Sequence, residues 1–131
     1  MKIVSTIARY LLGLLFSVVG LNGFLNFLHQ PPPPEPLALQ FLGAVSASHF
    51  AASFFAIQVV GGLLLLSGYF VPLALTLLAA ELYNILAFHL MFESGSGIGP
   101  GLVACVLWVL VFLRYRASFN SILGPKPASL P

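Results

Sequence analysis

The sequence predicts an all-α integral membrane protein: a four-helix up-down bundle with an extra short surface or re-entrant helix between its first and second spans. Three observations predict this fold. The 131 residues are 60% hydrophobic and 6% charged, with a mean hydropathy of +1.05, whereas soluble domains contain about 25% charged residues. Apolar stretches long enough to cross a bilayer recur along the chain. The charged residues lie outside these stretches, except for Glu81.

The charges are also separated by sign. All five basic residues lie in the two terminal segments, at Lys2, Arg9, Arg114, Arg116 and Lys126. Glu35 and Glu93 lie in internal loops. By the positive-inside rule this distribution predicts two cytoplasmic termini and therefore an even number of crossings of the lipid bilayer. No basic stripe is present that could follow a phosphate backbone, so nucleic-acid binding is not expected.

The first span is expected over Tyr10–Leu28, nineteen uncharged residues that run from inside to outside. A cleaved signal peptide is the competing interpretation, because Lys2 and Arg9 form a basic segment before the apolar stretch. The stretch is longer than the apolar core of about 7 to 15 residues typical of such signals, and it lacks a clean small-x-small cleavage site. An uncleaved span is therefore favoured.

The segment after the first span predicts a connector and then a separate short helix. Residues 31–36 are rich in proline, which favours a stiff, extended aqueous loop. A helix running continuously from Pro36 to Ser67 would be about 48 Å long at ~1.5 Å per residue, too long for one crossing. We therefore expect a surface-lying or re-entrant helix over Leu37–His49, bent near Gly43 to His49.

The remaining spans follow from glycine, proline and charge positions. The second span is expected over Phe50–Ser67 and the third over Pro72–Phe92, with Gly68 ending the one and the proline opening the other. So short a connection predicts an antiparallel hairpin. The fourth span is expected over residues 98–113, and residues 114–131 are expected to form a short cytoplasmic tail that frays from Ala117 onward. The whole chain is then a single transmembrane domain.

Glu81 lies near the middle of the third span, where a charge costs roughly 2.5 to 3.5 kcal/mol. Gln58 and Glu81 are equally far from the centre of the turn between their helices, which predicts equal depth and a hydrogen bond, most simply with a protonated acid. Asn84 follows on the same face at i+3. These three residues either bind a ligand or only join helices. The intramembrane carboxyl favours function for Glu81, and helix joining is favoured for the two amides.

A second polar set is expected near the outer surface. Asn22 and Asn26 share one face of the first span, and His29, His49 and His89 stand at span ends. Together they suggest a polar cleft for the headgroup of a quinone or another amphiphile, although interfacial histidines more often only face water and headgroups. A metal site is not expected, because no two histidines share an i, i+3 or i, i+4 spacing and no carboxylate completes a ligand set.

Small residues are expected to allow close contact between the helices. They are Gly13, Ser17, Gly20, Gly61, Gly62, Ala80 and Ala87. Their positions on the first three spans predict tight packing of these helices against one another.

Several runs resemble a known family of small bacterial membrane proteins. The runs Gly13–Phe16 and Gly20–Phe24 resemble the first helix of the DoxX and DoxX-like family. Gln58–Gly68, the following Pro72–Leu75 and a third helix that closes on His89 resemble it too. The resemblance implies the same four-helix fold, an inner-membrane location and association with membrane redox systems, such as quinone-linked sulfur or respiratory enzymes.

The chain departs from the family pattern at two positions. Many relatives have an acidic residue where Gln58 stands here, and a lysine is common at the position of Gly23. If those charges serve proton or anion chemistry in the family, this chain has lost that chemistry or moved it to Glu81.

Three functions follow as alternatives. The first is an accessory subunit of a quinone-linked membrane redox system, with quinone as the candidate cofactor and redox enzyme subunits as candidate partners. The second is a small proton-coupled transporter that uses Glu81 and, with so few spans, acts as a homo-oligomer. The third is a purely structural or assembly protein. No catalytic motif is recognised, so no enzymatic activity is assigned.

Overall fold

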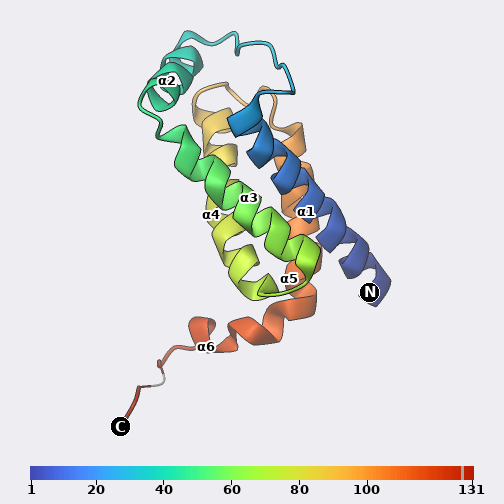
Figure 1. Cartoon of the computed structure of the whole chain (residues 1–131). Coiled ribbons are helices and arrows are strands. Elements are labelled where there is room, and N and C mark those ends of the chain that lie inside the picture. Colours follow the sequence, from blue (N-terminus) through green and yellow to red (C-terminus); the bar gives the residue numbers. More distant parts are fainter. Residues whose placement is uncertain (128) are drawn as a thin grey trace.

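The computed structural model describes residues 1–127 and 129–131, and these residues form helices and loops without any strand. The elements are α1 (Lys2–Leu25), α2 (Pro36–Ala47), α3 (Ala51–Ser67), α4 (Val71–Met91), α5 (Gly99–Tyr115), the 3₁₀ helix η1 (Arg116–Phe119) and α6 (Asn120–Leu123). Figure 1 shows α1, α3, α4 and α5 side by side. The N-terminus, the α3–α4 turn and α6 lie at one end, here named the terminal end, and α2 lies at the other.

The four long helices form a closed ring of contacts. α1 packs against α3 and α5, and α4 packs against the same two helices. The core between them is apolar, and its largest fully buried side chains are Leu12, Leu65, Leu75, Leu78, Val71 and Val111. Each long helix therefore has two neighbours and one outward face.

The outward faces are apolar. Three helical segments are long and apolar enough to cross a membrane, namely Lys2–Leu25, Val71–Met91 and Gly99–Leu123. α2 and α3 pass the same test only as a pair, and they are bent by 82° at the break between them. Large side chains about half exposed to the outside include Leu14, Leu63, Leu73 and Val106. Such a surface is typical of helices that face lipid.

The sharp bend between α2 and α3 confirms that this segment is not one continuous helix. α2 ends at Ala47 and α3 begins at Ala51, so the break lies at the end of the predicted interval. His49, within the break, has a left-handed backbone with φ 59°. Histidine adopts this conformation more often than most residues do. The chain turns there, and α2 lies across the end of α3 instead of extending it (Figure 1).

The turn between α3 and α4 is built as the glycine and proline predict. Gly68 adopts φ 78°, and its N–H bonds to the carbonyl of Leu64, which ends α3. Phe70 is also left-handed, with φ 54°, and Pro72 lies in the first turn of α4. The two helices are therefore antiparallel, and their register is fixed by a short turn.

α1 differs from the expected span Tyr10–Leu28 at both ends. It begins at Lys2, because a charge limits an apolar stretch but does not stop a helix. It ends at Leu25, because Asn26 adopts a left-handed conformation with φ 50°. Hydropathy predicted where the apolar region lies, whereas backbone capping decides where the helix ends.

The chain after Leu113 is more ordered than expected of a fraying tail. α5 continues to Tyr115, and η1 and α6 follow directly. Phe119 is buried, and its ring centroid lies 5.1 Å from that of Phe112 on α5. The first part of residues 114–131 is thus helical and held by an aromatic contact.

Close packing of α1 on α3 depends on small residues. A Cβ atom added to Gly62 would lie 2.5 Å from Ser17 Oγ and 2.6 Å from Ser17 N, so the helix backbones are almost in contact. The other predicted small residues are buried too, except that Ala87 is half-buried and Ala80 exposed. The prediction is wrong for Ala80, because α4 turns the side of Glu81 inward and leaves this alanine outside.

Arg9 joins α1 to the end of α3. Its Nη1 donates to the carbonyl of Leu65 and, at 3.5 Å, to that of Leu66. The last carbonyls of a helix have no partner within the helix, so a cation placed there satisfies them and favours the negative end of the helix dipole. This contact was not predicted from the sequence.

Candidate functional site

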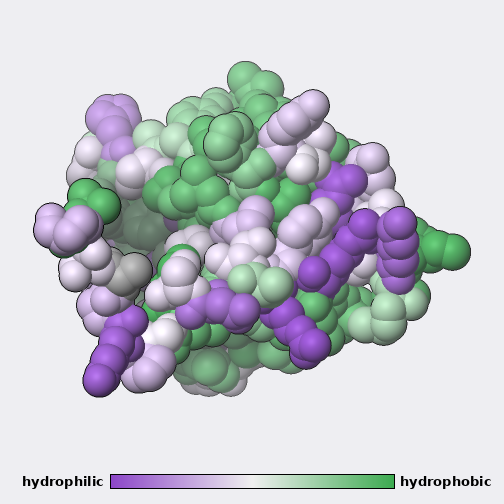
Figure 2. All heavy atoms as spheres, turned by 90° about the horizontal axis from the view of Figure 1, so that it is seen from below, coloured by the Kyte–Doolittle hydropathy of each residue, from purple (hydrophilic) through white to green (hydrophobic). Residues whose placement is uncertain are grey.

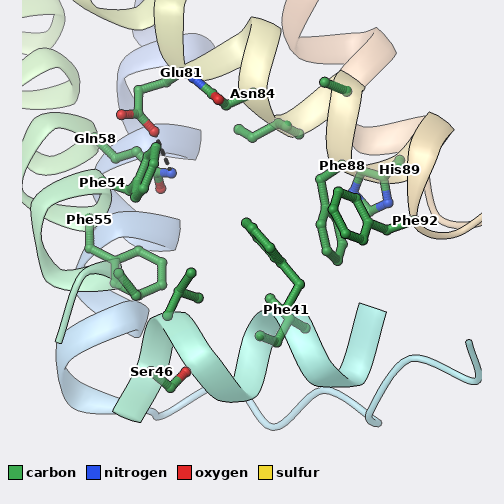
Figure 3. A pocket seen from close by; sticks show the side chains of 15 residues that line it. Phe41, Ser46, Phe54, Phe55, Gln58, Glu81, Asn84, Phe88, His89 and Phe92 are labelled. Atoms are coloured by element: carbon green, nitrogen blue, oxygen red, sulfur yellow. Dashed lines mark hydrogen bonds between the residues drawn. The ribbon is translucent and has the colours of Figure 1, made fainter. Parts of the chain in front are cut away.

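A cavity of about 370 Å³ lies between α2, α3 and α4, away from the terminal end (Figure 3). Its volume falls within the range of roughly 300 to 1,000 Å³ typical of small-molecule sites. The side chains that matter for its chemistry are Phe41, Phe54, Phe55, Gln58, Glu81, Asn84, Phe88, His89 and Phe92. The lining is thus mostly aromatic and apolar, with a few polar groups.

The inner part of the cavity holds the Gln58–Glu81 pair. Gln58 Nε2 donates a hydrogen bond to Glu81 Oε2 at 3.2 Å, and the two residues are 5% and 3% exposed. This bond confirms the prediction that the two residues lie at equal depth, which follows from their equal distance to the turn. Gln58 Oε1 is buried and accepts no hydrogen bond from the described residues. One acceptor at the cavity is therefore unsatisfied.

Phenylalanine rings form the walls of the cavity. Phe41 extends from α2 into the space, and its ring centroid lies 4.8 Å from that of Phe92 and 5.7 Å from that of Phe88 on α4 (Figure 3). Phe54 and Phe55 line the cavity from α3. Such centroid distances are those of favourable aromatic pairs. Phe41 therefore connects α2 to α4 and makes α2 one wall of the cavity.

His89 is held at the edge of the cavity by the loop after α4. Its Nδ1 lies 2.5 Å from Glu93 Oε2 and 2.9 Å from the carbonyl oxygen of Ser96. A carbonyl oxygen can only accept, so Nδ1 carries the hydrogen and donates it. A carboxylate thus stands beside one of the histidines, which the sequence analysis had not expected. The i, i+4 spacing of His89 and Glu93 was the signal that could have indicated it.

Asn84 also lines the cavity, at i+3 from Glu81. Its side chain is exposed, and its Nδ2 donates to the carbonyl of Ala80 at 2.9 Å. The amide therefore lies at the wall without joining the Gln58–Glu81 hydrogen bond. Its contact is within its own helix, so the structure does not make it a link between helices.

Asn22 and Asn26 do not lie with His89. Asn22 Oδ1 accepts from the backbone N–H of Leu28 at 2.6 Å, and its Nδ2 donates to the carbonyl of the same residue at 3.4 Å. Asn26 forms the left-handed end of α1. Neither asparagine lines the cavity, and neither do His29 and His49. Of the expected outer polar set, only His89 contributes to it, because the asparagines are used to end α1.

The arrangement offers two kinds of contact to a ligand. The rings of Phe41, Phe54 and Phe88 provide apolar and stacking surfaces, and the Gln58–Glu81 pair provides hydrogen-bonding groups. A molecule with an apolar body and a small polar group would match both. These phenylalanine rings were not singled out in the sequence analysis. The i, i+4 spacing of Phe88 and Phe92 was a signal that could have indicated one aromatic face, but no spacing in the sequence places Phe41, whose position depends on the bend before α3.

Comparison of the chain with models of known protein families, with curated protein sequences and with solved structures finds no match. The resemblance to the DoxX family therefore stays a prediction. Function has to be inferred from the geometry of the cavity.

Proposed function

We propose that this chain is a DoxX-like four-helix protein of the bacterial inner membrane that binds an amphiphilic ligand in the α2–α3–α4 cavity, as an accessory subunit of a quinone-linked redox system. The observation that carries the proposal is the buried Gln58–Glu81 pair in a cavity with aromatic walls. A carboxyl is costly in an apolar span, so its retention beside an empty volume favours a binding role.

A quinone-like headgroup fits the chemistry of this cavity. Its planar ring can stack offset on phenylalanine rings such as Phe41 and Phe54. A quinol hydroxyl can donate to the unsatisfied Oε1 of Gln58, and a quinone carbonyl can accept the second hydrogen of its Nε2. The apolar part of the lining suits the isoprenoid or acyl portion of the ligand. Partner subunits of the redox system are inferred from the family resemblance.

In the proposed topology α1, α3, α4 and α5 cross the bilayer, α2 lies along the outer surface, and both termini are cytoplasmic. The basic residues near both termini support this orientation, because they obey the positive-inside rule. The sharp bend before α3 supports the surface position of α2.

Cysteine accessibility tests this topology. In a Cys105→Ser background, a membrane-impermeant maleimide applied from the outer side should label Glu35→Cys. It should label Lys126→Cys only after the membrane is permeabilised. Labelling of both positions from the same side would contradict the topology without bearing on the cavity.

Ligand analysis tests the binding proposal. Protein purified in mild detergent should contain a co-purifying quinone or related amphiphile, detected by mass spectrometry of the extract. Glu81→Gln should weaken binding of a short-chain quinone analogue by at least about tenfold, since a buried charge-assisted or acid hydrogen bond contributes roughly 1.5 to 3 kcal/mol. Tyr83→Phe is the matched control, because Tyr83 is exposed on the same helix and does not line the cavity. Absence of any amphiphile, together with equal binding by both variants, would overturn the proposal.

A proton-coupled transporter is the second candidate. The observation in its favour is that Glu81 is the one carboxyl within the proposed spans and lines an open cavity. Uptake by proteoliposomes should then depend on a pH gradient and be lost in Glu81→Gln. Uptake that is independent of the gradient would exclude this candidate.

A further inference from the structure

We propose that the terminal end carries a separate binding site for the phosphate headgroup of an anionic phospholipid, between the start of α1 and the end of α5. A hollow of about 580 Å³ lies there. Its lining includes three cations, Lys2, Arg114 and Arg116, together with Ser5, Leu110 and Leu113. The inference uses the proposed membrane location but does not depend on the α2–α3–α4 cavity.

The charge at this end is not balanced by the protein. The chain has three acidic residues, Glu35, Glu81 and Glu93, and none of them lines the hollow. Among the residues that the structure describes, the one acidic side chain within 4.0 Å of a basic one is Glu93, which lies 2.5 Å from His89 Nδ1 at the end of α4. Figure 2 shows hydrophilic side chains gathered across the terminal end and bordered by hydrophobic ones. A bound anion would supply the missing negative charge.

Arg114 is held in place for such an anion. Its Nη1 donates to the carbonyl of Lys2 at 3.0 Å, to Ser5 Oγ at 3.3 Å and to Thr6 Oγ1 at 2.9 Å. These bonds fix the guanidinium between α5 and the first turn of α1. They use one nitrogen, so Nε and Nη2 keep donors in the fork geometry that suits phosphate oxygens.

The apolar surroundings favour a lipid over a free anion. Leu110 and Leu113 line the hollow beside the cations. Ile3 and Ile7 on α1 are 75% and 54% exposed, so apolar surface continues outward next to the charged residues. An acyl chain can cover this surface while the phosphate meets the cations. Basic pockets between membrane helices on the cytoplasmic side are known to bind anionic lipid headgroups.

The test compares phosphatidylglycerol with phosphatidylcholine. Native mass spectrometry of the full-length protein in detergent, with each lipid added separately, should show one phosphatidylglycerol bound more tightly than phosphatidylcholine. In Lys2→Gln/Arg116→Gln the affinity for phosphatidylglycerol should fall about 25-fold, since a basic residue near a lipid surface contributes roughly a fivefold gain. Lys126→Gln, which removes a cation outside the hollow, should change the affinity less than about twofold.

The lipid affinities and the variants decide whether the hollow binds an anionic phospholipid. Equal affinity for the two lipids, or an unchanged affinity in the double variant, would overturn it. Inorganic phosphate that displaces phosphatidylglycerol at equal concentration would identify a free-anion site and overturn the lipid assignment. If the double variant unfolds in both lipids, Arg116→Gln alone should still lower the affinity about fivefold, and no decrease would reject the site. Binding of the quinone analogue should not change in these variants, which separates this site from the cavity.

Discussion

The hydrogen bond between Gln58 and Glu81 can be measured as a coupling energy. Glu81→Leu and Gln58→Leu each remove one partner with little change in side-chain volume, and the double variant removes both. A single substitution leaves the other polar group buried without its partner, whereas the double variant leaves an apolar contact. The cycle therefore isolates the pair even if removal of the carboxyl alone stabilises the span.

The structure sets the expected magnitude. The donor–acceptor distance is 3.2 Å, at the long end of the usual range for an N–H···O hydrogen bond, and the two side chains are almost fully buried. We therefore expect a bond of moderate strength. Hydrogen bonds between membrane helices contribute roughly 0.6 to 2 kcal/mol. We expect a coupling of about 1 kcal/mol, which is about fivefold in the unfolding equilibrium constant.

The assay is unfolding in mixed micelles with increasing denaturing detergent. Trp108 is a suitable fluorescent probe, because its Nε1 donates to the carbonyl of Leu75 at 2.9 Å and so reports the contact between α5 and α4. Circular dichroism gives the helix content in the same titration. Free energies that add to within about 0.3 kcal/mol would refute the pairing.

Three further predictions concern packing. Gly62→Ala should destabilise the protein by about 1 to 3 kcal/mol, because the added Cβ would overlap the backbone of α1. Gly43→Ala is the control: its added Cβ meets open space, so it should stabilise α2 by about 0.5 to 1 kcal/mol. Equal unfolding curves for the two variants would contradict the close contact between α1 and α3. Phe41→Ala should increase hydrogen exchange over residues 36–47 with little effect on global unfolding. Leu37→Ala, at an exposed position of the same helix, should leave this exchange unchanged. Unchanged exchange in Phe41→Ala would show that other contacts hold α2. Arg9→Gln should cost about 1 to 3 kcal/mol in unfolding free energy, because it leaves carbonyls at the end of α3 unsatisfied, and an unchanged unfolding midpoint would contradict that capping role.

The parts of the fold that depend on local signals were predictable. Gly68 and Pro72 define a short turn, and a short turn fixes the register of the helices on either side. That register is enough to pair Gln58 with Glu81 from the sequence alone. The bend before α3 was predictable from length, because one helix from Pro36 to Ser67 would exceed the bilayer.

The parts of the fold that depend on contacts between residues far apart in the sequence could not be predicted from it. The ends of α1 are decided by the caps at Asn22 and Asn26, so two asparagines expected at the site serve the backbone instead. Phe41 reaches α4 only because α2 is bent by 82° relative to α3 and lies across its end. Long-range contacts such as that of Arg114 with the start of α1 have no spacing rule in the sequence that could reveal them.

Photo-crosslinking with a photoreactive quinone analogue shows directly whether the α2–α3–α4 cavity binds the ligand. The purified protein is irradiated with the analogue in lipid nanodiscs, and the labelled peptides are identified by mass spectrometry. Binding in the cavity should place labels on residues 54–58 of α3, on residues 81–91 of α4 and on Phe92, and excess unlabelled analogue should abolish them. Labels spread over the outward faces of α1 and α5, or labels that excess analogue does not reduce, would contradict it.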